Sequence, residues 1–509
     1  MGVIAKQSFH GTVANYIGTA IGFVTTFFVL TRFLSPEEIG LSNILVSVAT
    51  LFMSFAQMGT MSSTVRFFPY FYDKEKNDYN GFFFLTLFLS LLGFVLVGIM
   101  YVLFHTTLSN WFGEKSALFV SYYYMVIPIA FCILYKNVFA TNVLVFQKVV
   151  VSQFVNEVFI RLCLLAVYLL YAFRRIDLDG FVWGICASYG LAMLCNVVYF
   201  FHVSHISLKP NLSFFRSHID LLKKYFSYTL YILFYTVIDC IAPYAATFFI
   251  TAQLGLDYTG IYTIALNISF MVSMIVRAFL ASSSTILAPL VKENDLKGIK
   301  RLISQYSNNS FLIGGLIFAV IWFNIDAFFV LLPNGATYAV AKNVIFVLCF
   351  LQLIATTFSI IPVLLNYSRF FVFSFVFSIL QSVLAVVFNN YFIPIYGMMG
   401  SAISNLLFHS IWITCLLITI RIPMQVSPFT MQLFKSLIFI ILLFVCNFAF
   451  QQFLSPWLLP SLGIIGESAL RSVILFPIAL WVFYKTRLSE EVISNVLQFL
   501  TRKGIISKK

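Results

Sequence analysis

The sequence is dominated by uninterrupted apolar runs of about 20 residues, the length of helix that crosses ~30 Å of hydrocarbon. The strands of a membrane β-barrel would instead appear as shorter segments of alternating polarity. Of the 509 residues, 61% are hydrophobic and only 10% are charged, whereas an ordinary soluble domain is about 25% charged. The sequence therefore predicts an all-α integral membrane protein with about fourteen transmembrane helices.

The net charge of +13 arises from Lys and Arg residues that lie mostly between the apolar runs. Nucleic-acid binding needs basic residues gathered on one solvated face, so we expect no nucleic-acid partner. If the N-terminus is cytoplasmic, every inner segment carries a Lys or Arg, as the positive-inside rule requires. The few cations that then fall on the outer side are Arg32, Lys115, Arg174, Arg175, Lys342 and Arg471. Both termini are predicted to be cytoplasmic.

Two segments outside the spans have amphipathic character. In 287–308, Leu296, Ile299 and Ile303 are interspersed with basic residues, and the tail after Arg487 repeats this pattern. We expect both to lie as interfacial helices on the inner leaflet, attracted by anionic lipids. Simple solvated helices are the alternative.

No spacing of metal ligands is present. The eight cysteines all fall inside apolar stretches without a C-x-x-C pair, and His202 and His205 have no carboxylate beside them. We expect no metal site and no organic cofactor.

The chain contains an internal repeat with a shift of 220 residues. Positions 28–69 align without gaps on 248–289, and eight pairs are identical, among them Gly40 with Gly260 and Pro69 with Pro289. The shift covers an even number of spans, so the two halves are parallel repeats. Transporters built from repeats bind substrate near the bilayer midplane, where the repeats meet, and alternate between two openings.

The repeat predicts four regions. These are an N-terminal six-helix lobe (1–205), a cytoplasmic linker (206–224), a C-terminal six-helix lobe (225–420), and two extra transmembrane helices with a basic tail (421–509).

The string Thr31-Arg32-Phe33-Leu34-Ser35-Pro36-Glu37-Glu38-Ile39-Gly40 resembles a signature that follows the first span in the polysaccharide-transporter, or oligosaccharide flippase, family. Gly59, Arg66-Phe67-Phe68-Pro69, Gly260-Ile261-Tyr262, Ala288-Pro289 and Tyr396-Gly397-Met398-Met399-Gly400 match as well. The family belongs to the multidrug/oligosaccharidyl-lipid/polysaccharide exporter superfamily.

This resemblance covers essentially the whole chain. It implies a V-shaped pair of six-helix bundles in the bacterial cytoplasmic membrane that move undecaprenyl-diphosphate-linked oligosaccharide from the inner to the outer leaflet. The product would supply O-antigen, capsule or exopolysaccharide assembly, with polysaccharide polymerase machinery as a partner. The lipid II flippase branch carries an arginine where our alignment places Asn267, which makes a peptidoglycan precursor a less favoured substrate.

A charge inside hydrocarbon costs at least ~2.5–3.5 kcal/mol, so intramembrane cations are candidates for function. Lys136, Arg161 and Arg277 lie within predicted spans, all in the inner half of the bilayer, and Arg66 lies at the cytoplasmic mouth. We predict that these four residues bind an anionic headgroup. Gln57, which aligns with Arg277 in the repeat, joins the predicted set.

Structural roles compete for some of these residues. Glu157 precedes Arg161 by four residues, the favourable order for an ion pair on one helix face. Arg66, near a helix end, could instead extend to lipid phosphate.

Asp239, four residues before Pro243, is the main acidic candidate, and Glu157 is the second. A buried carboxylate can carry H⁺, or it can bind Na⁺ together with carbonyls that a proline leaves free. We predict ion coupling at these positions. A static ion pair of Asp239 with Lys136 or Arg277 is the alternative.

Two other functions fit an apolar chain of this size. The first is a cation-coupled exporter of small molecules, although a cationic cavity would repel organic cations. The second is a membrane polysaccharide polymerase or ligase, but the sequence has no long outer loop, no G-x-S-x-G motif and no phosphate-binding loop. We predict a transporter with no catalytic residues.

Overall fold

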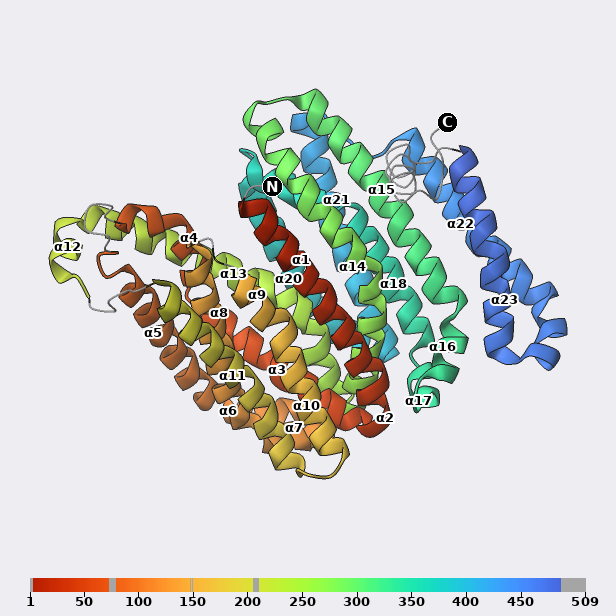
Figure 1. The fold of residues 1–509 in the computed structure, drawn as a ribbon, viewed down its shortest axis with the longest axis horizontal. Helices are drawn as coiled ribbons and strands as arrows, with labels where there is room; N and C mark the ends of the chain where they lie inside the picture. Colours follow the sequence, from red (N-terminus) through yellow and green to blue (C-terminus); the bar gives the residue numbers. More distant parts are fainter. Residues whose placement is uncertain (1–2, 73–78, 147, 149, 205–209, 487–509) are drawn as a thin grey trace. The chain divides into compact units, whose positions relative to one another are not determined.

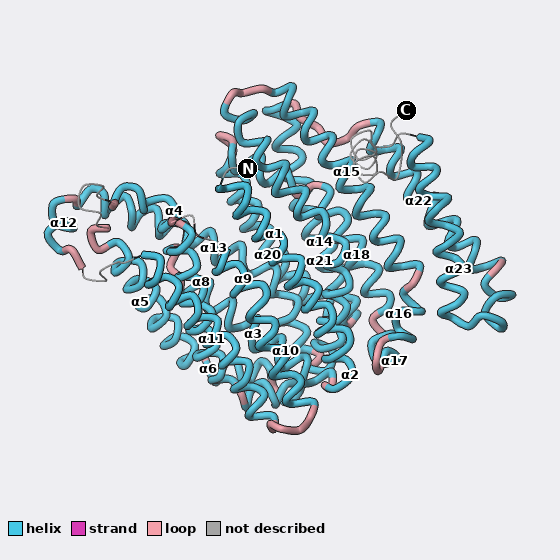
Figure 2. Tube along the Cα trace, in the orientation of Figure 1, coloured by secondary structure: helices cyan, strands magenta, loops and turns pink. Residues whose placement is uncertain are grey.

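The computed structural model describes residues 3–72, 79–146, 148, 150–204 and 210–486. Throughout this part the chain forms helices joined by loops and turns, without strands (Figures 1 and 2). Fourteen helices in it are long and apolar enough to cross a membrane. The predicted all-α membrane fold and its helix number are confirmed.

The first six candidate spans contain α1 (Val3–Val24), α3 (Pro36–Ala56) with α4 (Thr60–Phe71), α5 (Phe82–Leu103), α8 (Val126–Leu144), α9 (Val150–Phe154) with α10 (Ile160–Ala172), and α11 (Leu178–Ser204). The next six contain α13 (Ile219–Gln253), α14 (Leu256–Lys292), α15 (Leu296–Phe323), α18 (Lys342–Thr357) with α19 (Ile360–Tyr367), α20 (Phe371–Tyr396) and α21 (Met398–Met424). The last two spans are α22 (Met431–Phe453) and α23 (Ser455–Thr486). The short helices are α2 (Thr31–Phe33), α6 (His105–Phe112), α7 (Ala117–Ser121), α12 (Leu212–Ser217), α16 (Ile325–Leu331) and α17 (Gly335–Ala339).

The sequence after the first span begins α3. Ser35 is the N-cap: its side chain accepts from the Glu38 backbone N–H, and the Glu38 carboxylate accepts from the Ser35 N–H. Pro36 occupies the first helical turn, where its missing N–H costs nothing. This reciprocal capping explains why the helix starts at Pro36, ahead of the apolar residues that follow.

The chain divides into two compact units. The first comprises 1–263 with 382–401, and the second comprises 264–381 with 402–509. In the first unit, Gly40 and Gly260 mark a close approach of α3 and α14. A Cβ on Gly40 would lie 2.1 Å from the Leu256 carbonyl oxygen, and one on Gly260 would lie 1.9 Å from that of Pro36. These contacts are related by the same 220-residue shift, so repeat-equivalent backbones touch reciprocally where neither can carry a side chain.

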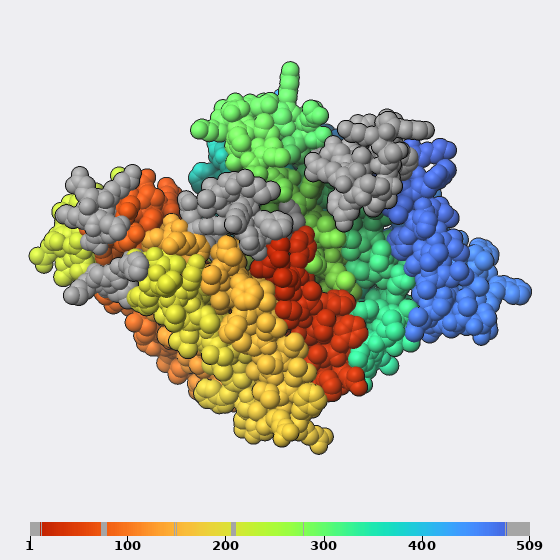
Figure 3. All heavy atoms as spheres, viewed as in Figure 1, coloured from red at the N-terminus to blue at the C-terminus, as the bar shows by residue number. Residues whose placement is uncertain are grey.

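Aromatic residues form the core at one end of the first unit. Phe71, Phe82, Phe83 and Tyr225 are almost fully buried there, and they join α4 and α5 to the start of α13. In the second unit, α15, α22 and α23 share an apolar cluster, and α22 and α23 appear in blue in Figure 3.

One expectation is wrong in part. The amphipathic segment within 287–308 is no separate interfacial helix, because Leu296 begins α15, which continues into a span. Ile299 and Ile303 are buried in the second unit against Leu287 and Leu416. Their apolar face therefore contacts protein in place of lipid. The tail after Arg487 lies outside the described residues.

Candidate functional site: a cationic–aromatic pocket and a tyrosine stripe

A cavity of about 780 Å³ lies where α4 ends and α13 begins. Three cations and three tyrosines contribute to its lining. We call this cavity the cationic–aromatic pocket, and its lining residues are Arg66, Phe67, Tyr70, Leu221, Lys223, Lys224, Ser227, Tyr228 and Tyr231. No carboxylate is among these described lining residues, although the Asp220 carboxylate lies 3.9 Å from the Lys223 ammonium. The three cations therefore leave an excess of positive charge.

Small and hydroxyl residues bring α4 against α13 and so position the pocket. A Cβ on Gly59, which precedes α4 with φ +74, would lie 2.4 Å from the Thr229 carbonyl oxygen. One turn later, the Ser63 and Thr229 hydroxyls are 2.7 Å apart and both are buried. The positive φ favours glycine, and the close approach leaves no room for a side chain.

Aromatic rings hold Arg66 at the pocket. Its guanidinium carbon lies 4.2 Å from the centroid of the Tyr228 ring and 5.8 Å from that of Phe67. Phe67 is itself packed edge-on against Tyr225 at 5.5 Å between ring centroids. Arg66 remains exposed, so its N–H groups are available to an anion while the stacked ring limits its motion.

A stripe of polar side chains extends from the pocket along α13. Tyr228, Tyr231, Tyr235 and Asp239 are three or four residues apart, so they share one face of the helix. Tyr235 interacts electrostatically with both Tyr231 and Asp239. At 1.5 Å per residue, Asp239 lies about 16 Å along the helix from Tyr228. Its side chain is exposed on the stripe.

The interior of the first unit brings together Lys136, Glu157 and Arg161. Arg161 Nη2 donates to Glu157 Oε2 at 3.2 Å, which is the anticipated ion pair. Lys136, on α8, is 9% exposed and has Glu157 as its electrostatic neighbour. Within the described chain, Lys136 forms no hydrogen bond or ion pair. Arg161 in turn interacts with Tyr189 on α11.

The remaining predicted residues have separate environments. Gln57 is buried at the break between α3 and α4 in the first unit. Arg277, on α14, belongs to the second unit, where it is exposed and lies 5.9 Å from the Phe270 ring centroid. The headgroup role of Arg277, like that of the other cations, stays a prediction.

Lys223 and Lys224 were missed as site residues because the sequence places them in an inner loop, where cations serve topology. The length of α13 is the observation that points to both lysines. α13 is 35 residues long, which is more than one span requires. Its first turns carry both lysines immediately before the tyrosine stripe.

The fold resembles that of known transporters. A structure of the lipid II flippase MurJ in an inward closed conformation matches with a TM-score of 0.70 and 13% identity, covering 94% of this chain and 99% of that one. An inward-facing multidrug resistance MATE family transporter of the MOP superfamily matches with a TM-score of 0.64 and 14% identity, over 82% and 98%. For a MOP superfamily transporter from Pyrococcus furiosus the values are 0.58 and 15%, over 83% and 95%.

At these identities the likeness establishes the fold alone. No curated protein matches the sequence. Family membership comes instead from the sequence model of the polysaccharide biosynthesis proteins, which matches residues 4–286. That match covers more than half of the chain, including the capped α3, the cationic–aromatic pocket and the tyrosine stripe, so the chain belongs to the polysaccharide biosynthesis protein family.

Proposed function

We propose that this protein is a flippase for undecaprenyl-diphosphate-linked oligosaccharide. It moves its substrate from the inner to the outer leaflet of the bacterial cytoplasmic membrane by alternating access, with both termini cytoplasmic. The glycan would then pass to polysaccharide polymerase machinery for O-antigen, capsule or exopolysaccharide assembly. Membership of a polysaccharide biosynthesis family and a MOP-type fold support the proposal.

The cationic–aromatic pocket is the observation that carries it. A diphosphate presents several anionic oxygens, and an arginine can grip two of them in a forked pair. Arg66, Lys223 and Lys224 supply three positive charges. Asp220 pairs with Lys223 at 3.9 Å, but both side chains are largely exposed, so this ion pair is weak enough for a ligand to replace. Tyr228 and Tyr231 add apolar faces against which a sugar or prenyl group can pack.

The interior cations give the headgroup a second position in the first unit. Lys136 is a buried charge without a hydrogen bond among the described residues, and such a group is costly unless an anion reaches it. The ion pair uses only the Nη2 group of the Arg161 guanidinium, so other N–H groups of this side chain can donate to a ligand. We propose that these two residues bind the headgroup during transport, and we propose the same role separately for Arg277 in the second unit.

Ion coupling is assigned to Asp239, with H⁺ or Na⁺ as the ion. Its position on the tyrosine stripe also favours a second candidate function, export of a small organic cation. Tyrosine faces and a carboxylate together attract cations. The two candidate functions require substrates of opposite charge. The cationic–aromatic pocket favours an anion, and the tyrosine stripe around Asp239 favours a cation.

Transport by proteoliposomes tests the proposal. Purified protein is reconstituted with a fluorescent polyprenyl-diphosphate-linked oligosaccharide, and flipping is measured as access of an external glycosidase to the label. We expect the triple variant Arg66→Ala/Lys223→Ala/Lys224→Ala to lose flipping and Arg277→Glu to abolish it.

The matched control is Lys297→Ala/Lys300→Ala/Arg301→Ala, which removes the same charge from exposed positions of α15. It should flip at the native rate. Full flipping by the pocket variant would overturn the proposal. Uptake of a labelled quaternary ammonium ion, lost in Asp239→Asn and unaffected in the pocket variant, would establish the cation exporter in its place.

A further inference from the structure

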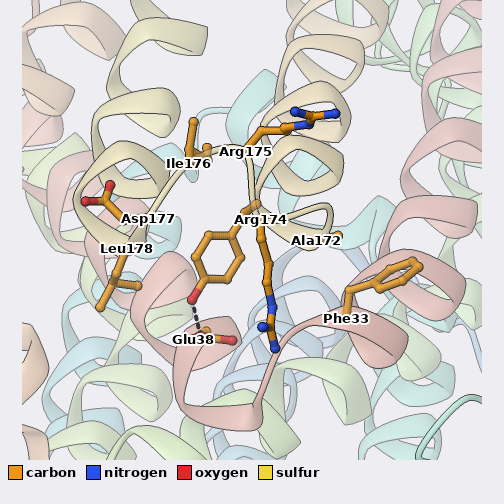
Figure 4. Close-up of a pocket in the computed structure, with 9 residues that line it drawn as sticks. Phe33, Glu38, Ala172, Arg174, Arg175, Ile176, Asp177 and Leu178 are labelled. Carbon is orange, nitrogen blue, oxygen red and sulfur yellow. Dashed lines mark hydrogen bonds between the residues drawn. The ribbon is translucent and has the colours of Figure 1, made fainter.

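A second cavity lies at the opposite end of the first unit, between the end of α10 and the starts of α3 and α11 (Figures 1 and 4). Its volume of about 850 Å³ is in the range of small-molecule sites, about 300–1,000 Å³. We call it the mixed-charge pocket, and its lining includes Phe33, Glu38, Tyr171, Arg174, Arg175 and Asp177. Both pockets have aromatic rings in their lining, but only the mixed-charge pocket is lined by carboxylates as well as cations.

Capping interactions fix the two carboxylates. Glu38 is held by the Ser35 N–H and by the Tyr171 hydroxyl, which donates to Oε1. Asp177 Oδ1 accepts from the Gly180 N–H at 2.8 Å at the start of α11. Each carboxylate oxygen has two lone pairs, so both groups retain acceptor capacity toward a ligand.

Arg174 occupies a backbone position that usually belongs to glycine. Its φ is +55, and the Arg175 N–H donates to the Leu170 carbonyl at 2.9 Å, so the chain closes α10 with a left-handed residue. A non-glycine residue in this conformation costs free energy. Such backbone strain points to a function when the side chain lines a binding site. Figure 4 shows the Arg174 side chain extending toward Glu38, while Arg175 points away from it.

A hydrogen bond next to the pocket involves Asp179, which follows the lining residues Asp177 and Leu178. Tyr122 donates its hydroxyl to Asp179 in the first turn of α11. Burial, followed by this hydrogen bond, raises the pKa of Tyr122 to about 12.

The lining selects against simple ions. Glu38 and Asp177 repel an anion, and Arg174 and Arg175 repel a cation. A neutral ligand with many hydroxyls satisfies both signs at once, because each hydroxyl donates to a carboxylate and accepts from a guanidinium. Phe33 and Tyr171 offer flat apolar surfaces that suit the C–H face of a pyranose ring.

We propose that the mixed-charge pocket binds a neutral pyranose unit of a glycan. The inference rests on the proposed function for the source of that sugar, which is the glycan of the transported lipid, on the outer side in the predicted topology. A free oligosaccharide has the same chemistry, and the experiment distinguishes the two sources.

Binding is measured by saturation-transfer difference NMR on the full protein in nanodiscs. The probes are free neutral pyranosides, both hydroxylated and N-acetylated, with inorganic phosphate as the anionic comparison. We expect millimolar saccharide binding that weakens at least about tenfold in Glu38→Gln and in Arg174→Gly, since each removes a charged hydrogen-bond partner.

Arg174→Gly separates binding from folding, because glycine relieves the positive φ and should leave the melting temperature equal or higher. Lys342→Ala, a charge change in the second unit, should bind the probes like the native chain. Absence of saccharide binding, binding that is unchanged in both pocket variants, or phosphate bound in place of saccharide would each overturn the inference.

The flippase assay is read in parallel. Saccharide binding without flipping would overturn the proposed function and leave the pocket as a site for free glycan. Flipping without saccharide binding would overturn only the inference that the mixed-charge pocket binds a pyranose, and the proposed function would stand. Flipping that slows in Arg174→Gly together with lost binding identifies the lipid-linked glycan as the ligand.

Discussion

Two ion pairs with the same sequence spacing have different surroundings in the two units. Glu157 and Arg161 of the first unit are four residues apart, with Glu157 in a short π-helical turn (Val155–Phe159) and Arg161 in α10, which follows it. Their side chains are 35% and 34% exposed. Glu467 and Arg471 have the same order and spacing on α23 of the second unit, where they are only 5% and 2% exposed. The same sequence spacing therefore leads to a partly exposed pair in one unit and a buried pair in the other.

The buried pair belongs to a wider network. Arg471 also donates to the Phe323 carbonyl at the end of α15 and to the Ser468 hydroxyl, and Ser455 donates to Glu467. The Phe323 carbonyl is one of the acceptors that a helix end leaves without a partner. The network thus joins α23 to the end of α15. Arg161, in contrast, makes a single hydrogen bond to Glu157.

The largest effect is expected at Arg471. Arg471→Ala leaves the Glu467 carboxylate buried without its counter-ion and removes the donor to Phe323, which should lower the free energy of unfolding by about 3–5 kcal/mol. Denaturant titration in detergent measures the loss. The double variant Glu467→Leu/Arg471→Met should recover most of it, because apolar residues of similar volume need no counter-ion. A loss below about 1 kcal/mol in Arg471→Ala would contradict the importance of burial.

Lys136 tests a buried cation that lacks a bonded partner. Lys136→Met should leave the protein as stable or more so, because the desolvated charge is removed. Flipping should fall roughly 10- to 100-fold if Lys136 bonds the headgroup, since charged hydrogen bonds contribute about 1.5–3 kcal/mol. Unfolding and flipping are measured on the same preparation. A Lys136→Met variant that is destabilised but flips at the native rate would show that Lys136 has a structural role and does not bind the headgroup.

Arg161 tests the half-exposed pair. Arg161→Gln should change the free energy of unfolding by less than about 1 kcal/mol, since pairs exposed to this degree contribute little. The proposed function predicts a clear loss of flipping in the same variant. A stability loss comparable to that of Arg471→Ala, with flipping retained, would show that the pair is structural.

The smallest effect is expected for Lys342 and Asp326, whose atoms lie 2.6 Å apart with side chains 38% and 43% exposed. Lys342→Ala should cost at most about 0.5 kcal/mol, and flipping should be unchanged. Thermal unfolding provides the measurement. A larger loss of stability would mean that the short distance between the charged atoms, and not their exposure, determines how much such an ion pair contributes to stability.

Much of the fold was predictable because its causes are local. Apolar runs of membrane length gave the fourteen helices, and Ser35, Pro36 and Glu38 form the capping box that starts α3. The spacing of Glu157 and Arg161 indicated their ion pair correctly. The candidate site was predictable only in part: Arg66 was identified, but Lys223 and Lys224 looked like loop cations.

Sequence alone thus determined the membrane-length helices and their number, since each depends on residues within a few turns of one another. Packing decided the rest. Ile299 and Ile303 contact protein in place of lipid. Arg471, which was predicted to lie among the outer cations, is buried with Glu467. Spacing along a helix fixes which side chains share a face. Whether that face meets solvent, lipid or another helix depends on partners far away in the chain, and burial sets the energy of a charge.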